Sequence, residues 1–498
     1  MFSFAKTFFD KLASKIKMIW SFFLLKTKSK DKFIFIIKKI LFFFGVVTVL
    51  TMFSDYCRLF TFGGKVFVLP FYLSFISFPL FLFYFIFLER PRNIEKIFIC
   101  GAIVIMFSSL LYLSLALIQQ PFFVGYKNSS PLKVYLLSLL KYIYDFVAIL
   151  FLVFFTSLLS QKEISRAIYS LIIIWFLLTI FQFIIFKTKN INISYAYDTL
   201  DFLRIIPDSK LFLNQNSFRA YGFSREPASS WIFFSVFSIP FLTTKLFIKS
   251  SRWNKLFNTA LLILVMLSVF LTKSPTSFLG VFLSFFVSLY CLVSDHIITK
   301  RVFLIFIMAF ISFAILCFAI PFTRKVLLEQ IIFRFIDASD NSSLDRYSSL
   351  YNNILIFAKS PIFGCGDGLQ AFYYFKNIIN SVFAQNYGVY TQYYRNSELL
   401  TGSSALPSLI GGFGLYGIVG FFLLCKMNLK LCSNNKKNLI SIFYRGGFIS
   451  IVVCMLTALH FHHNYELLFV LFMPLCLSKN EASVMPIMDS GSYYYIEI

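Results

Sequence analysis

Long apolar runs, separated by short polar or basic segments, repeat along the whole chain. Each run has about 20 residues, which as a helix is long enough to cross a hydrocarbon core of about 30 Å. The polar faces that a soluble helical solenoid would need between the runs are missing. By window length we expect about twelve membrane spans, at roughly residues 36–54, 66–88, 97–118, 134–159, 167–186, 228–248, 256–272, 275–293, 302–321, 403–425, 441–459 and 464–478. The pattern predicts an all-α, polytopic transmembrane helix bundle that forms one integral membrane domain over residues 1–498.

Composition and charge placement support this topology. Hydrophobic residues make up 58% of the chain and charged residues 14%, against about 45–50% and about 25% in soluble domains. The net charge of +24 comes from basic clusters in alternate short loops, which is the positive-inside pattern of membrane proteins. With both termini in the cytoplasm, every cluster falls on the cytoplasmic side, so the charge reports topology and nucleic acid is not an expected partner. The clusters are the lysine-rich N-terminus, Arg90/Arg92/Lys96, Lys245/Lys249/Arg252/Lys255, Lys300/Arg301 and Lys426/Lys430/Lys436/Lys437.

The N-terminal segment, residues 1–30, places apolar side chains at helical spacing with lysines between them. This pattern predicts an amphipathic basic helix on the inner leaflet, with a flexible basic tail as the alternative. No small-residue cleavage site follows an apolar core, so we expect no cleavable signal peptide. The nine cysteines lack metal-ligand spacing, and no metal or cofactor is expected.

Two long outer loops, residues 187–227 and 322–402, then carry most of the polar residues, with cations and anions nearly in balance. Aromatic residues in the second loop, which precedes the last three spans, argue against disorder. Part of this loop is predicted to be helical, because apolar residues from Leu344 to Phe357 repeat at helical spacing after a cap at Asp340 or Ser342. Ser360-Pro361 would end that helix. The glycines at 364, 366 and 368 indicate a tight turn more than a phosphate-binding loop.

Candidate chemistry is concentrated in the stretch RAYGFSREPASSW, residues 219–231. Arg219 and Arg225 suit a phosphate or pyrophosphate, since guanidinium groups bind such oxygens bidentately. Glu226 is a candidate general base for a sugar hydroxyl, and Pro227 fits the first turn of a following helix. In the alternative reading Glu226 pairs with Arg225 and caps that helix. Lys273, in the short TKSPTS connection, adds a cation at the same face or extends only to the lipid headgroups.

Two further groups remain open. Lys141 and Asp145 are four residues apart inside a predicted span, where ionisable pairs are either functional or structural. His460, His462, His463 and Asn464 mark the last outer turn. No acidic or cysteine ligand is near them in sequence, so a hydrogen-bonding or acid–base role toward a substrate is favoured over metal binding.

At three motifs the chain resembles the O-antigen polymerases and the related O-antigen ligases of bacterial surface-polysaccharide assembly. These are the R-x-x-G-F-x-x-E-P stretch at 219–227, Arg346 followed by SPIFGCGDG at 360–368, and GGFGLYGIVG at 411–420. The number of spans and the long outer loop before the last three are similar too.

The resemblance implies a metal-independent glycosyltransferase of the bacterial inner membrane, which joins undecaprenyl-pyrophosphate-linked oligosaccharide units at the periplasmic face. The product would be O-antigen, capsule or exopolysaccharide, and a chain-length regulator and a flippase would be partners alongside membrane lipid. Arg219 and Arg346 match the arginines thought to hold the pyrophosphate. We expect Arg219, Glu226 and Arg346 to be catalytic, and the substrate-binding residues to be Arg204, Arg225, Lys273, Arg334, His462 and His463.

Two alternatives stay open. The first is an O-antigen ligase. The ligases resemble one another in having a functional histidine in the large outer loop, and residues 322–402 contain no histidine. The second is a lipid-linked oligosaccharide flippase, although charged or broken spans and two similar halves, which are typical of transporters, are not evident.

Overall fold

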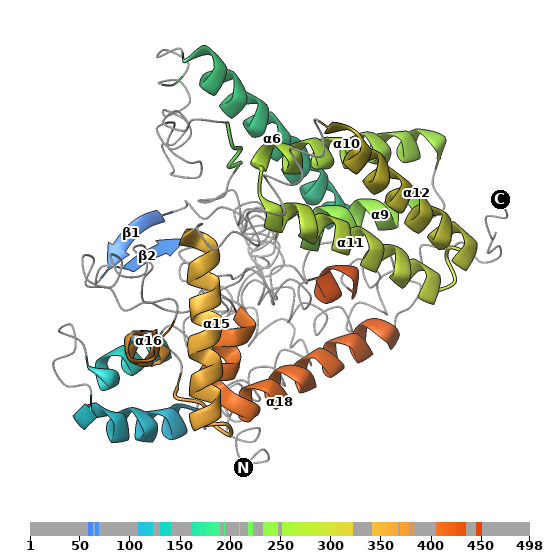
Figure 1. The fold of residues 1–498 in the computed structure, drawn as a ribbon. Helices are drawn as coiled ribbons and strands as arrows, with labels where there is room; N and C mark the ends of the chain where they lie inside the picture. The colour runs from blue at the N-terminus through green and yellow to red at the C-terminus, as the bar shows by residue number, and fades with distance from the viewer. Residues whose placement is uncertain are drawn as a thin grey trace, which may run out of the picture.

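The computed structural model describes residues 58–62, 65–68, 108–122, 130–140, 161–189, 194, 209, 218–222, 233–247, 251–321, 341–366, 369–378, 381, 405–434 and 445–450. These residues are mostly helical, and the helices form two neighbouring groups (Figure 1). Residues 1–30, Lys141, Asp145 and the histidines from 460 to 463, for which the sequence makes predictions, lie outside these described residues.

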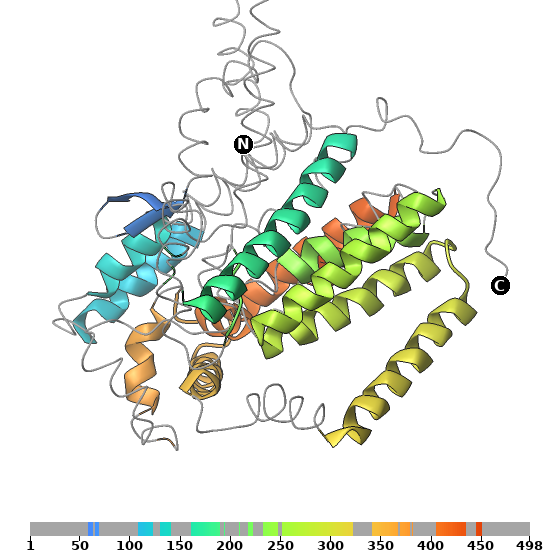
Figure 2. The ribbon, with the colours of Figure 1, turned by 90° about the horizontal axis from the view of Figure 1, so that it is seen from above.

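The first group consists of helices from the middle of the chain. They are α6 (Gln161–Thr188), the π-helix η4 (Phe233–Ser238), α9 (Ile239–Phe247), α10 (Arg252–Thr272), α11 (Pro275–Ser294) and α12 (Lys300–Ala319). α10 contacts α6, α9 and α11, and α11 also contacts η4, α9 and α12. Figure 2 shows this group from above. A further helical segment, residues 445–450, packs on it.

The second group combines segments that are far apart in sequence. It contains α15 (Asn341–Lys359), α16 (Gln370–Ile378), α18 (Ala405–Asn434) and the helical residues 108–122 and 131–140. α15 packs against α16 and α18. The core of the group joins Tyr112, Ala116 and Tyr135 to Ile356, Cys365, Leu369 and Phe372. Residues 108–122 and 131–140 are therefore part of the same unit as the described part of the predicted second outer loop.

Within the described residues, three helices are long and apolar enough to cross a membrane: Ser165–Thr188, Arg252–Thr272 and Ser277–Ser294. Shorter apolar helices cover Pro131–Leu140, Phe233–Phe247 and Pro407–Leu423. The helical character predicted from the apolar runs is confirmed for these residues, and three of the helices have the length and composition of membrane spans. The full set of about twelve spans and the sidedness of the loops stay predictions.

Local sequence explains where the central helices begin and end. Ser251 caps α10 by accepting a hydrogen bond from Asn254 N, and Ser274 caps α11 by accepting one from Ser277 N. Pro275 stands in the first turn of α11, where a missing N–H costs nothing. Because α10 ends at Thr272 and α11 begins at Pro275, the turn between them is two residues long, as predicted.

Small residues let η4, α9, α11 and residues 445–450 approach closely. A Cβ at Gly447 would lie 2.5 Å from the Val236 carbonyl oxygen, and one at Gly446 would lie 3.0 Å from Ser288 Oγ. Ser284 Oγ donates to the Ser235 carbonyl, which joins α11 to η4. Close contact through small and hydroxylated residues is how helices associate in lipid, where apolar burial gives little drive.

One prediction is wrong at the edge of a span. Residues 66–88 were expected to be membrane-spanning, but Lys65–Val68 is strand β2, which pairs antiparallel with β1 (Arg58–Phe62). The sequence RLFTFGGKVFV places β-branched and aromatic residues on both sides of Gly-Gly, which is a hairpin pattern. An average of hydropathy over about 20 residues does not detect this hairpin, because Val66, Phe67 and Val68 are equally apolar in a helix and in a strand.

Candidate functional site

The segment Phe218–Gly222, which contains the start of the RAYGF motif, lies folded between the apolar helices α6 and α10. Phe218 packs edge-on against Phe183 of α6, with ring centroids 5.1 Å apart. Ala220 N donates to the Leu271 carbonyl near the end of α10 at 2.9 Å. Ala220 is fully buried, and Tyr221 and Phe218 are nearly so. The segment is therefore held between the last turns of α6 and α10.

Gln182 of α6 satisfies the irregular backbone of this segment. Its Oε1 accepts from Tyr221 N at 3.0 Å and from Gly222 N at 3.1 Å, and its Nε2 donates to the Gly222 carbonyl at 3.1 Å. The side chain is 0% exposed. Gln182 is six residues before the end of α6, so the contact lies about 9 Å below that end at 1.5 Å per residue. Non-helical backbone at membrane depth is tolerated where protein groups satisfy it.

Only glycine fits at position 222, where the segment comes closest to Trp175. Its φ is +56°, and a Cβ there would lie 2.2 Å from Cε2 of Trp175. The indole of Trp175 is buried and stacks on Phe233 of η4, with centroids 4.8 Å apart. Gly222 and Phe233 thus both contact Trp175. Glu226 lies between these two residues in the sequence. The glycine of the R-x-x-G-F motif is explained by this close approach.

Arg219 is placed beside the α10–α11 turn, with its Nε–H donating to the Thr272 carbonyl at 3.4 Å. Thr272 directly precedes Lys273, which ends α10 in the left-handed conformation at φ 48°. Thr272 Oγ1 donates to the Val269 carbonyl at 2.7 Å and accepts from Ser274 N at 3.3 Å. These bonds fix the turn. The structure therefore brings two predicted site residues, Arg219 and Lys273, to one place.

The electrostatics of this place favour an anion. Arg219 and Lys273 are cations, and both are partly buried. The N-terminus of the 20-residue helix α11 starts two residues after Lys273, and the partial positive charge of a helix N-terminus attracts anions. Charges act more strongly here than in bulk water because the surrounding protein lowers the effective dielectric constant.

The second and third motifs pair with each other in the other helix group. The loop after α15 docks on the first half of α18 through four backbone hydrogen bonds: Cys365 N to Gly411 O, Gly366 N to Gly412 O, Leu415 N to Pro361 O and Tyr416 N to Ile362 O, at 2.8–3.0 Å. α18 is kinked at Gly414, where φ is 59° and ψ is −148°. A Cβ at Gly414 would lie 2.6 Å from the Pro361 carbonyl oxygen. The predicted glycine turn is confirmed for Gly364 and Gly366, both at positive φ.

A buried amide network lies behind that loop. Asn377 Nδ2 of α16 donates to Asn352 Oδ1 of α15 at 2.8 Å, and Asn352 Nδ2 donates to the Gln370 carbonyl at 3.3 Å. Gln370 Nε2 donates to the Ser408 carbonyl of α18 at 3.0 Å. Gly411 of α18 lies against Asn353, whose Oδ1 would be 2.1 Å from an added Cβ. These contacts fix α15, α16 and α18 relative to one another.

The other predicted site residues are placed less completely. Arg346 lies in the second turn of α15, and its side chain is outside the described residues. Its helix packs against α16 and α18, whereas Arg219 contacts α10. Arg204, Arg225, Glu226, Arg334, His462 and His463 lie outside the described residues.

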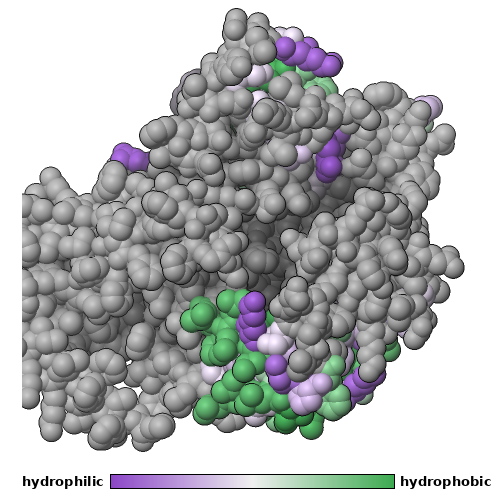
Figure 3. Space-filling view, turned by 90° about the vertical axis from the view of Figure 1, so that its left-hand side faces the viewer, coloured by the Kyte–Doolittle hydropathy of each residue, from purple (hydrophilic) through white to green (hydrophobic). Residues whose placement is uncertain are grey.

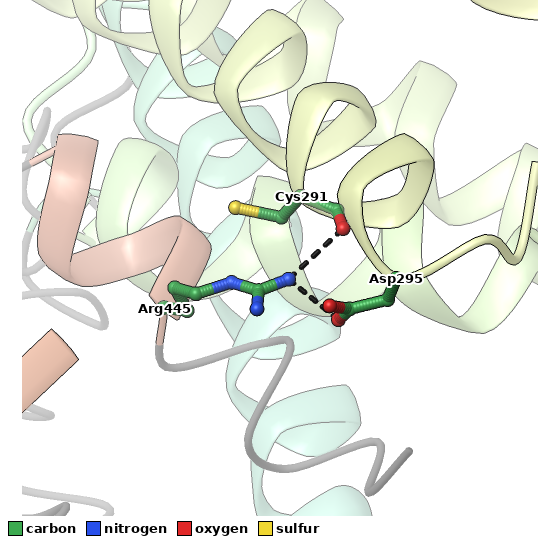
Figure 4. Close-up of polar contacts among 3 residues, drawn as sticks. All are labelled: Cys291, Asp295 and Arg445. Carbon is green, nitrogen blue, oxygen red and sulfur yellow. Dashed lines mark hydrogen bonds and ion pairs between the residues drawn. The ribbon is translucent and has the colours of Figure 1, made fainter. Parts of the chain in front are cut away.

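Two positioning contacts were missed by the sequence reasoning. Gln182 is a single amide in the apolar run 171–186, and such residues in spans commonly bond another segment. The second contact is an ion pair in which Arg445 Nη2 donates to Asp295 Oδ2 at 2.5 Å and to the Cys291 carbonyl at 2.9 Å (Figure 4). Asp295 follows the predicted span 275–293 and Arg445 lies inside the predicted span 441–459, 150 residues further on, so their pairing has no local sequence signal.

Comparison with known proteins adds no relationship: no protein-family model matches the chain, and no curated protein matches it significantly. Functional inference therefore rests on the residues and their arrangement.

Proposed function

We propose that the chain is a membrane glycosyltransferase that polymerises oligosaccharide units linked to undecaprenyl pyrophosphate. The observation that carries the proposal is the placement of Arg219 beside the Lys273 turn, at the end of two apolar helices. A substrate with a polyprenyl tail in the bilayer presents its pyrophosphate at this level. A cationic site at a helix end, next to the lipid, is suited to that group.

The proposed chemistry needs little beyond positioning and charge stabilisation. A hydroxyl of the acceptor sugar attacks the anomeric carbon of the donor glycan, and the bond from that carbon to the pyrophosphate oxygen breaks. The electron pair leaves with undecaprenyl pyrophosphate, whose developing charge Arg219 and Lys273 stabilise. The hydroxyl proton passes to a carboxylate, for which Glu226 is the candidate. No external energy source is required, because the pyrophosphate ester is already activated.

The buried segment explains how Arg219 is held for this role. Its neighbours are fixed by Gln182 and by the Leu271 carbonyl, so the guanidinium does not need to be ordered when substrate binds. Preorganised charges of this kind lower a barrier without the cost of reorientation. Arg219→Lys keeps the charge but loses the Nε contact with Thr272, and we expect it to lose most of the activity.

The test is a glycan ladder from a deletion strain complemented with wild type, Arg219→Ala, Arg219→Lys or Arg252→Ala, with the amount of protein in membranes measured for each. Arg252 is the matched control, since it is an exposed arginine at the opposite end of α10. We expect Arg219→Ala to reduce the ladder to a single repeat unit on intact lipid core, and Arg252→Ala to leave it unchanged.

Other outcomes identify the alternatives. Loss of all lipid core that carries repeat units, with long lipid-linked polymer accumulating, would assign the chain as a ligase. Absence of any repeat unit at the outer face would assign it as a flippase. A normal ladder in Arg219→Ala at wild-type protein levels would refute the role of Arg219.

A further inference from the structure

Helix α15 buries its polar side and exposes its apolar side. The buried residues are Ser348 and Ser349 at 0% exposure, Asn353 at 1% and Asn352 at 2%. The exposed residues are Ile354 at 54%, Tyr347 at 42%, Leu350 at 40% and Tyr351 at 37%. A helix on the surface of a water-soluble domain has the reverse arrangement, with its apolar stripe on the core.

The buried side makes its polar contacts within the protein, with Asn353 Oδ1 left without a hydrogen-bond partner. Asn352 bonds Asn377 and the Gln370 carbonyl, Ser348 bonds the Tyr374 hydroxyl, and Asn353 Nδ2 donates to the Ser349 carbonyl at 2.8 Å. This side therefore faces α16 and α18. The apolar side is left outward in the folded chain.

The apolar surface continues beyond α15 onto a neighbouring apolar helix. Ile362 and Phe363, which follow α15, are 57% and 39% exposed. The backbone at 361–362 is bonded to Leu415 and Tyr416 of α18. From Leu415 the exposed stripe runs along α18 through Val419, Phe422 and Leu423, at helical spacing. Figure 3 shows apolar side chains gathered in the lower part of another face of the same helix group, the side on which residues 108–122 and 131–140 lie in Figure 1.

We propose that α15 is embedded in the bilayer, and that its apolar side (Tyr347, Leu350, Tyr351 and Ile354), with Ile362 and Phe363, contacts lipid acyl chains. In hydrocarbon an apolar side chain gains little by turning inward, whereas every polar group must be satisfied inside the protein. α15 follows this distribution: Ser348, Asn352 and Asn353 Nδ2 bond within the protein, whereas the apolar side chains face outward. The non-helical loop after it meets the same requirement, because α18 satisfies its backbone through the bonds from Pro361 to Gly366.

This inference revises the prediction that residues 322–402 form a water-exposed outer loop, since the α15 part would belong to the membrane-embedded body. It does not depend on the proposed function. A second copy of the chain is the competing occupant of the same surface.

Photocrosslinking in native membranes tests the proposal. A benzophenone amino acid is placed in the full chain at Leu350 or Ile354, in cells fed a clickable fatty acid. Leu267, exposed on the spanning helix α10, is the positive control, and Lys300, the exposed first residue of α12, is the negative control. We expect lipid adducts at 350 and 354 comparable to those at 267 and well above those at 300.

Two results would overturn it. Adducts at 350 and 354 that do not exceed the Lys300 level would place this side of α15 in water, and crosslinks to a second copy would assign it to a homo-oligomer. A second measurement compares Ile354→Lys with Ile354→Leu by thermal stability in lipid nanodiscs. Contact with acyl chains predicts a lower unfolding temperature for Ile354→Lys alone, whereas an Ile354 in water predicts equal temperatures.

Discussion

The contact of Gln182 with Tyr221 and Gly222 gives the sharpest prediction. Gln182→Leu preserves the approximate size of the side chain and suits an apolar helix, so α6 itself should be unaffected. The substitution removes three hydrogen bonds at 3.0–3.1 Å and leaves two N–H groups and one carbonyl without their amide partner. All of these groups belong to residues that are buried.

The magnitude follows from the number of bonds lost. A typical intramolecular hydrogen bond stabilises by about 1 kcal/mol, and a buried group left unsatisfied costs about 1–3 kcal/mol. Three bonds therefore correspond to at least about 3 kcal/mol. The segment can relieve that cost by leaving its position, so we expect detachment of residues 218–222 while the helices stay folded. A change of about 3 kcal/mol raises the local opening equilibrium roughly a hundredfold.

Hydrogen exchange of peptides covering residues 218–222, measured by mass spectrometry in detergent micelles, reports this opening. We expect about a hundredfold faster exchange in Gln182→Leu, together with loss of activity in the ladder assay. Thr179→Val on the same face of α6 is the matched control. Thr179 is also 0% exposed, but its hydroxyl bonds the Trp175 carbonyl within the helix, and we expect a change of under about 1 kcal/mol.

Unchanged exchange at 218–222 in Gln182→Leu would refute the argument that Gln182 holds this segment. Faster exchange throughout α6 as well would mean that the substitution unfolds the bundle, and the local interpretation would then fail.

Three further predictions concern glycines and the ion pair. Gly222→Ala should lower the free energy of unfolding by about 2–5 kcal/mol, since positive φ costs about 1–2 kcal/mol and overpacking against Trp175 costs about 1–3 kcal/mol. The control is Gly420→Ala, whose Cβ would meet nothing within 4 Å, and an equal change in unfolding temperature for the two variants would contradict the prediction. Gly411→Ala should displace Asn353 and weaken the packing of α15 on α18, which faster exchange in residues 361–366 would report and unaltered exchange would disprove. Arg445→Ala should lower the free energy of unfolding by about 3–5 kcal/mol because it leaves the buried Asp295 carboxylate unpaired. In chemical denaturation, adding Asp295→Ala should restore part of that free energy. Strictly additive losses of free energy in the double variant would argue against the pair.

Local sequence was enough to predict most of the described helices. Apolar runs of the right length became α6, α10, α11, α12 and α18, because a chain in lipid must satisfy its backbone internally. The turn at Ser274-Pro275 and the end of α15 at Ser360-Pro361 were also readable, since caps and prolines act within one helical turn. Within the candidate site, the same reasoning identified Arg219 and Lys273 separately.

Tertiary structure decided what those elements do together. Arg219 bonds the Thr272 carbonyl, next to Lys273, because Gln182, forty residues from Gly222, holds the segment between α6 and α10. Asp295 meets Arg445 across 150 residues. The apolar repeat of α15 predicted a helix, but the helix turns its asparagines inward, because the partners of Asn352 lie on α16. Hydrophobic periodicity is a property of neighbours along the chain, whereas the choice of buried side depends on which distant groups, or which solvent, each side meets.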